Sequence, residues 1–314
     1  MKIIKIYILV LFALSAPKTY AQTDMVMIRP IDFSPGMVGN KETCISLSSR
    51  NINFSSDLNS HNTSLSYEFL SQKLKGGIGI SYTSSMTNFK NPDTFIFGKN
   101  SSQRLNIVYA PKIVYRKKLQ FSPFIKMSAM HINNDAWRNV YEADIRQLPI
   151  QQGEKYNLAS TSVGFLVNQR RWFFGAETYG ANTLLFDTLS LAHSMGFKYQ
   201  VGVFFNFTKS RKYGVSLILA NDWANDEGRL YNANNSILTV LKLSKVNVLF
   251  SYHSDFFGII NSSSVRLGLG YQPSKKLKIG YSINIAKDKW LNTFDHQIGI
   301  QYIIKKKDAA FFAG

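Results

Sequence analysis

Apolar and polar residues alternate with a period of two along most of the chain, and no apolar stretch is long enough to cross a bilayer as a helix. The clearest segment is 105–116, which has an apolar and a basic or polar face. After the short turn Leu119-Gln120, segment 121–130 repeats the pattern. Such alternation predicts β-strands with one apolar face. The apolar face of the first segment carries Leu105, Ile107, Tyr109, Pro111, Ile113 and Tyr115.

About 14 segments of this kind follow one another from residue 43 to residue 303. A membrane-spanning strand needs roughly 9–11 residues, and single-chain bacterial barrels have even strand numbers. The sequence therefore predicts an all-β fold, a transmembrane outer-membrane antiparallel β-barrel of about 14 strands. The predicted strands are 43–53, 62–70, 75–85, 102–116, 121–133, 157–168, 171–180, 194–208, 213–221, 236–243, 246–254, 264–273, 277–286 and 294–303.

A soluble β-sandwich would also alternate, but two features favour the barrel. Aromatic residues make up 14% of the chain, and tyrosines gather near strand ends, where a membrane-interface girdle places them. The opposite face carries Lys, Arg, Asn, Ser and Gly, which suits a hydrated interior. Connections alternate between short ones, such as 168–170, and long ones, 134–156 and 222–235, so we expect short periplasmic turns and long outer loops.

The chain begins with the features of an export signal. Lys2 and Lys5 precede a short apolar run, and Thr19-Tyr20-Ala21 forms a small-residue cleavage site. We therefore expect residues 1–21 to be a cleavable signal peptide, cut after Ala21. The predicted organisation continues with an N-terminal segment at 22–42, one barrel domain at 43–303 and a basic tail at 304–314, in the outer membrane.

Basic residues dominate the charge of the chain. It has 37 Lys and Arg against 19 Asp and Glu, for a net charge of +18. An exported chain with no basic helix stripe is not expected to bind nucleic acid. Outer-membrane lipid, an acidic protein partner and a wet interior remain as places for this charge. The candidate lumen residues on the polar strand faces are Arg104, Lys112, Arg116, Lys126, Lys198, Arg266 and Lys278.

Two roles for these basic residues stay open. They could simply solvate the lumen and pair with acids such as Glu177, or they could attract an acidic substrate segment by a focused positive field. Trp137, Trp223 and Trp290 fall in the expected long loops, where barrels commonly carry function, and are candidate partner-facing residues.

The sequence holds no pattern of enzymatic or metal chemistry. Cys44 is the only cysteine, so intramolecular disulfides and paired-cysteine metal sites are excluded. The five histidines lack a second ligand at metal spacing, and Ser254 and His253 point to opposite faces of one strand. We predict a protein that is not an enzyme and has no cofactor, metal or catalytic residues.

The segment after the signal resembles the opening of the PorP/SprF family of type IX secretion proteins. That family has Asn-Pro, a short spacer and Asn-Pro-Ala-x-x-Gly; here Pro30, Pro35 and Gly39 keep the spacing, while Ser34 and Gly36 replace Asn and Ala. The chain's closing strand, from His296 onward, is similar to the family's His-Glu-Ile ending, with Gln instead of Glu. Arg50-Asn51 and Gly76-Gly77-Ile78-Gly79 are further matches in order, although the family's tryptophan after the first-strand arginine is missing.

The resemblance implies an outer-membrane barrel that binds a cognate exported protein, such as a gliding adhesin, and supports its secretion or attachment to the cell surface. The implied partners are this exported protein, other type IX secretion components and outer-membrane lipid. The alternating pattern alone supports a second hypothesis equally well, a general porin with a basic, anion-preferring lumen.

Overall fold

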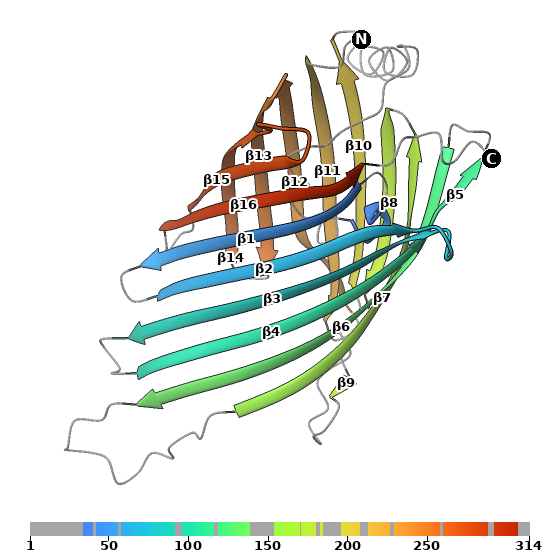
Figure 1. Ribbon diagram of the computed structural model, residues 1–314. Helices are drawn as coiled ribbons and strands as arrows, with labels where there is room; N and C mark the ends of the chain where they lie inside the picture. Colours follow the sequence, from blue (N-terminus) through green and yellow to red (C-terminus); the bar gives the residue numbers. More distant parts are fainter. Residues whose placement is uncertain are drawn as a thin grey trace, which may run out of the picture.

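Strands of the computed structural model form one closed antiparallel barrel (Figure 1). β1 pairs with β2 on one side and with β16 on the other, so the first and last strands meet and complete the ring. β5 extends the β4 strand along β6, and β9 adds two residues beside β7. The other fourteen strands form the wall, which confirms the predicted fold class and strand number.

The structure describes residues 34–39, 42–55, 58–91, 96–115, 119–138, 154–169, 171–179, 183–184, 196–207, 213–226, 229–257, 260–287 and 292–306. The strands are β1 (Glu42–Ser55), β2 (Leu58–Ser71), β3 (Gly76–Asn91), β4 (Ile96–Pro111), β5 (Ile113–Tyr115), β6 (Leu119–Arg138), β7 (Glu154–Gln169), β8 (Trp172–Tyr179), β9 (Thr183–Leu184), β10 (Gly196–Asn206), β11 (Tyr213–Asp226), β12 (Arg229–Leu243), β13 (Val246–Phe257), β14 (Ile260–Tyr271), β15 (Leu277–Lys287) and β16 (Asn292–Lys306). The predicted signal peptide and Pro30 lie outside the described residues.

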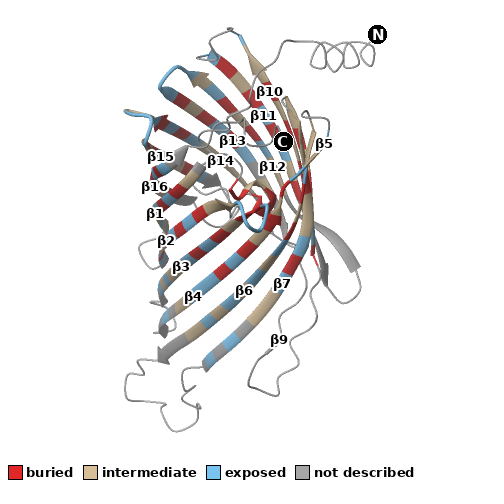
Figure 2. Cartoon of the chain, turned by 45° about the vertical axis from the view of Figure 1, so that its right-hand side comes forward, coloured by how far each residue is buried: buried red, intermediate tan, exposed pale blue. Residues whose placement is uncertain are grey.

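Buried and exposed residues alternate along the strands, as Figure 2 shows. The exposed positions form an apolar outer surface, because side chains at alternate positions of a barrel strand face the lipid. Tyr67, Tyr271 and Tyr302 lie on this surface towards the short-turn ends of their strands. That arrangement is the aromatic girdle expected at one membrane interface. No helix among the described residues is long and apolar enough to cross a membrane.

Several strands extend further at the long-loop end than the sequence predicts. β6 ends at Arg138, and β11 and β12 are separated only by residues 227–228, so the predicted loop bounds 134–156 and 222–235 are wrong. Trp137 and Trp223 therefore lie in strands rather than loops, and Trp290 falls outside the described residues. The period-two pattern fades here because residues beyond the lipid need no apolar face, while the backbone continues to pair.

The segment Ser34–Gly39, here called the plug, lies inside the barrel against β4, β6 and β7 (Figures 1 and 2). Its 3-10 turn η2 (Pro35–Met37) begins with proline, whose fixed φ suits a first helical position. Val38 is fully buried, and Gly39 has a φ of +67°, a conformation that favours glycine. A side chain at Gly39 would meet the Cα of Gly77 at 2.7 Å. The plug therefore depends on backbone-to-backbone contact with β3.

A cluster of buried apolar side chains lies on the inner wall beside the plug. Met37 of the plug packs against this cluster, and the rings of Phe173 and Phe204 lie 5.6 Å apart between centroids. All members come from parts of β7, β8 and β10–β13 near the short turns. The members are Leu166, Phe173, Phe204, Ile218, Leu238, Val240 and Leu249.

Replacing Gly77 with alanine is expected to loosen the plug. The added methyl group would lie 1.8 Å from the carbonyl oxygen of Val38, a backbone atom that cannot move aside alone. Overpacking of this kind costs about 1–3 kcal/mol. The variant barrel should unfold at a lower temperature than wild type when its mobility is followed by electrophoresis in SDS after stepwise heating.

Gly175→Ala is the matched control for this change. The nearest atom to its added methyl group is the flexible end of the Leu166 side chain, at 3.3 Å. This control should unfold close to the wild-type temperature. Equal unfolding temperatures for Gly77→Ala and wild type would show that the plug contact contributes nothing to stability.

Candidate functional site: the barrel interior

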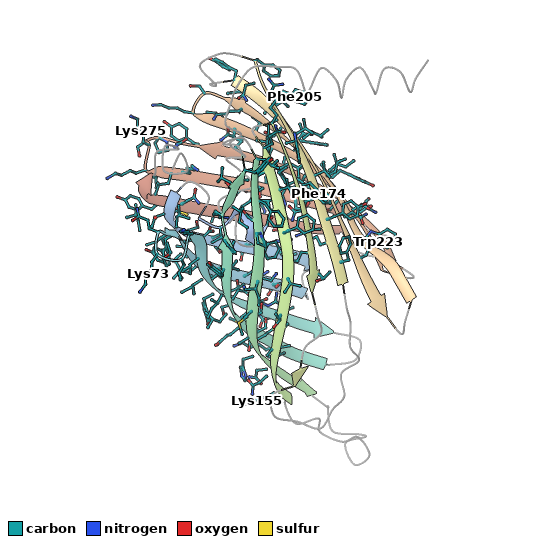
Figure 3. All side chains as sticks on the ribbon, turned by 90° about the vertical axis from the view of Figure 1, so that its right-hand side faces the viewer. Lys73, Lys155, Phe174, Phe205, Trp223 and Lys275 are labelled. Carbon is teal, nitrogen blue, oxygen red and sulfur yellow. The ribbon has the colours of Figure 1, made fainter. Side chains whose placement is uncertain are left out.

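The two ends of the barrel differ in their connections. The short connections 72–75, 244–245 and 272–276 lie at the same end as the described beginning of β1 and the end of β16. In Figure 3, Lys73 and Lys275 mark this end, and Lys155 and Trp223 mark the other. Short turns are periplasmic and long loops extracellular in outer-membrane barrels, so we call these the periplasmic and outer ends.

The interior can be divided into two layers by their height along the barrel. The periplasmic layer holds the plug and the apolar cluster of β7, β8 and β10–β13, together with buried polar residues of other strands such as Glu68, Lys278 and Gln301. The outer layer is polar, with buried hydroxyl and amide groups that bond to one another across strands, as in Ser48 with Ser64 at 2.8 Å and Asn106 with Ser81 at 3.0 Å.

Lys112 binds the plug instead of solvating a channel. Its Nζ donates a hydrogen bond of 2.6 Å to the carbonyl oxygen of Gly36, and the side chain is 7% exposed. Glu68 on β2, only 2% exposed, is the acid whose charge acts on this lysine. A buried cation needs such partners, since an unpaired one would pay a large desolvation cost. Lys112 is thus a structural residue of the periplasmic layer.

Lys126 and Glu177 form an ion pair across an intervening strand. The Nζ of Lys126 on β6 donates to Oε1 of Glu177 on β8 at 2.7 Å. Both residues face β7, where their register partners are Ser162 and Gly164. Because these two residues are small, the lysine can reach over β7 to the carboxylate. Lys198 on β10 is the register partner of Glu177 on the other side.

Arg50, Arg266 and Asp295 form a second charged group, in the outer layer. Oδ2 of Asp295 on β16 accepts from Arg50 of β1 at 2.5 Å and lies 3.5 Å from Arg266 of β14. Asp295 is 2% exposed, whereas both arginine side chains keep part of their surface accessible. One carboxylate therefore serves two guanidinium groups, and the group carries a net positive charge.

Sequence reasoning did not select Arg50 or Asp295 as site residues. Their contact joins positions 245 residues apart, and it depends on the register of the β1–β16 seam, where Arg50 lies opposite Gln297 and Ile52 opposite Asp295. The available signal was the alternation of β1, which places Arg50 on the same face as the buried Ser46 and Ser48.

The remaining predicted basic residues have different surroundings. Arg104 on β4 contacts the sulfur of Met130 at 3.2 Å and is exposed. Lys278 is buried near the start of β15, and Arg116 lies outside the described residues. The six candidates that the structure describes therefore have different surroundings. Lys112 contacts the plug, Lys126 pairs with Glu177, and Lys278 is buried at the periplasmic end, whereas Arg104 and Arg266 lie in the outer layer and Lys198 lies opposite Glu177.

The histidines show no metal chemistry in the part of the chain that the structure describes. No group of three or more potential ligands among those residues could hold a metal ion. His296, the family-motif residue, lies on β16, and its Nδ1 is 2.6 Å from the hydroxyl of Tyr281 on β15. His61 and His131 bond to asparagines of neighbouring strands. Of the other motif residues, Pro35 and Gly39 belong to the plug.

No family model and no curated protein matches this chain. Solved structures do match in shape. The monoaromatic hydrocarbon channel CymD aligns over 89% of this chain and 93% of its own, with 10% identity and a TM-score of 0.61. The fold is that of an outer-membrane β-barrel. The toluene transporter TbuX of Ralstonia pickettii aligns over 92% and 96% with a TM-score of 0.57 at 10% identity. CdiB of Escherichia coli aligns over 82% and 63% with a TM-score of 0.54 at 9% identity.

Replacing Glu177 with glutamine tests the ion pair. Lys126 would lose its carboxylate partner in a partly buried position, which costs about 1.5–3 kcal/mol. The free energy of unfolding should fall by that amount when urea denaturation of the barrel in vesicles is followed by tryptophan fluorescence. The double variant Lys126→Met with Glu177→Gln should recover part of the loss, because it leaves no unpaired charge at position 126. Additive losses would contradict the pairing.

Proposed function

We propose that the protein is an outer-membrane accessory of the type IX secretion system, which binds a cognate exported, adhesin-like protein and supports its secretion or surface attachment. The observation that carries the proposal is the plug. The family-like segment with Pro35 and Gly39 folds into the barrel, where Lys112 and Gly77 hold it. The motif residues Pro35 and Gly39 thus belong to one structural element, the plug.

The apolar cluster and the plug near the periplasmic end argue against the general-porin hypothesis. A porin needs a continuous aqueous path lined by polar side chains. Here buried apolar residues such as Leu166, Phe173 and Ile218 occupy the interior together with Met37. The basic residues at that level are engaged, as Lys112 with the plug illustrates. An accessory that recognises a protein at the outer side needs no such path.

The long strands at the outer end supply a rigid recognition surface. β6 has 20 residues and β3, β4 and β7 have 16 each, whereas β8 has 8 and β10 has 11. A spanning strand needs about 9–11 residues. On one side of the wall, the strands are therefore longer than the membrane requires, and their extra length lies towards the predicted long loops.

A second candidate function is passage of small apolar molecules. The apolar cluster, which includes Phe204 and Leu249, favours it, because such side chains could contact an apolar solute along the inside of the barrel. Similarity of fold to a toluene transporter agrees with this candidate, but at 10% identity it does not distinguish the two functions.

Affinity purification tests the accessory function. The tagged protein, extracted from outer membranes in mild detergent, should recover one large exported protein or secretion components in near-equal amount by mass spectrometry. Deleting the gene should reduce surface display of that same exported protein. Recovery of the barrel alone, with unchanged surface display in the deletion strain, would overturn the proposal.

Transport measurements separate the alternatives. If the protein is an accessory, the barrel reconstituted in a planar bilayer should show no steady anion current, because the plug and apolar side chains occupy part of the interior near the periplasmic end. A stable anion-selective conductance would favour the porin. Cells that gain uptake of radiolabelled toluene when they produce the barrel would favour the apolar channel.

A further inference from the structure

We infer that the outer layer of the barrel interior binds an extended acidic peptide segment, with carboxylates held by Arg104 at one point and by Arg50 and Arg266 at another. That the segment belongs to the exported partner rests on the proposed function. The residues themselves, and their spacing on the wall, come from the structure.

The arginines carry more positive charge than their acidic neighbour neutralises. Asp295 is the carboxylate that bonds both Arg50 and Arg266, and Oδ2 is the oxygen that both approach. The Nε of Arg266 and Oδ1 of Asp295 are buried without a hydrogen-bond partner among the described residues. The group is thus incompletely satisfied, and the arginine side chains are 36% and 22% exposed. A guanidinium with free donors binds a carboxylate well.

Arg104 provides a separate cationic point on the same inner wall. Its contact is the thioether of Met130, which is a weak acceptor and carries no charge. In the strand register, Arg104 lies opposite Thr83 of β3. Thr83 lies opposite Ser64 of β2, and Ser64 opposite Ser48 of β1. Ser48 is one inward position from Arg50 along β1, so the two arginines lie at nearly the same level.

The wall between the two points is polar and carries no charge. Ser48 and Ser64 are buried there and share a hydrogen bond, and the half-buried Thr83 continues the row of hydroxyl groups. The acid of β2, Glu68, is buried nearer the periplasmic end of its strand than Ser64 and is the acid that acts on Lys112.

The spacing selects an extended segment over a small anion. Three steps between neighbouring strands separate β4 from β1, or about 14 Å at the usual strand spacing of about 4.8 Å. One sulfate or acetate cannot bridge that distance. In an extended chain, residues four apart lie on the same face and about 13 Å from each other. Carboxylates at positions i and i+4 therefore match the two points.

Binding of a fluorescein-labelled hexaglutamate peptide to the purified full-length barrel, measured by fluorescence anisotropy, tests this inference. Hexaglutamate should bind, and hexaglutamine of equal length should not. Arg104→Gln should weaken hexaglutamate binding about tenfold, the effect of losing one charge-assisted hydrogen bond. This single change leaves the Asp295 group intact, and so it separates binding from folding.

A second variant and a charge control complete the design. Arg50→Gln, Arg266→Gln and Asp295→Asn together remove the other point without leaving an unpaired aspartate, and should also weaken binding about tenfold. Lys73→Gln, Lys275→Gln and Lys276→Gln remove positive charge from exposed periplasmic turns. This control should bind hexaglutamate like wild type. An equal loss in the control, or equal binding of hexaglutamine by wild type, would overturn the site.

Spaced peptides test the geometry. An octapeptide with glutamates at positions 2 and 6 should bind more tightly than one with glutamates at positions 2 and 3, and Arg104→Gln should abolish the difference. Equal affinities in wild type would overturn the two-point arrangement. If hexaglutamate binding follows the expected pattern while affinity purification recovers the barrel alone, the accessory function fails and the acidic-segment site stands. If affinity purification recovers a partner but hexaglutamate does not bind, the accessory function stands and the acidic-segment site fails.

Discussion

Backbone hydrogen bonding in a solvent without water is the constraint on which this structure depends. Every N–H and C=O group in the hydrocarbon layer must find a partner in the protein, so a sheet can span a membrane only when it has no free edge. The seam between β1 and β16 satisfies this condition by joining the two ends of the described sheet. Once the ring is closed, lipid dictates the outer side chains, and the inner ones are free to differ from one end to the other.

That freedom produces two interior layers with opposite properties. Near the periplasm, the plug packs against the apolar cluster, and the cation Lys112 is tolerated because Gly36 and Glu68 accompany it. Towards the outer end, hydroxyl groups and arginines line the wall, and Asp295 balances only part of their charge. A closed barrel of this kind can present different inner chemistry to the two sides of the membrane.

The sequence predicted the parts of the molecule that lipid imposes and missed those that depend on register. Alternation along segments such as 105–115 follows directly from the difference between the two faces, and it located all fourteen strands of the wall. Beyond the lipid no such pattern exists, so the ends of β11 and β12, and with them Trp223, were assigned to a loop. The pairing of Arg50 with Asp295 required knowledge of which strands meet at the seam. The motif with Pro35 and Gly39 was visible, but its place inside the barrel was not.

The location of the plug also bears on the order in which the barrel assembles. The strands that hold it most closely are β3, β4, β6 and β7, within the first 170 residues, so that half of the chain can curve around its own N-terminal segment early. Closing the seam brings together residues about as far apart as the chain allows, such as Glu42 and Lys306. The entropic cost of closing a loop grows with its length. We therefore expect a curved half-barrel that already holds its plug to precede the ring, with insertion into the outer membrane completed by the last strand.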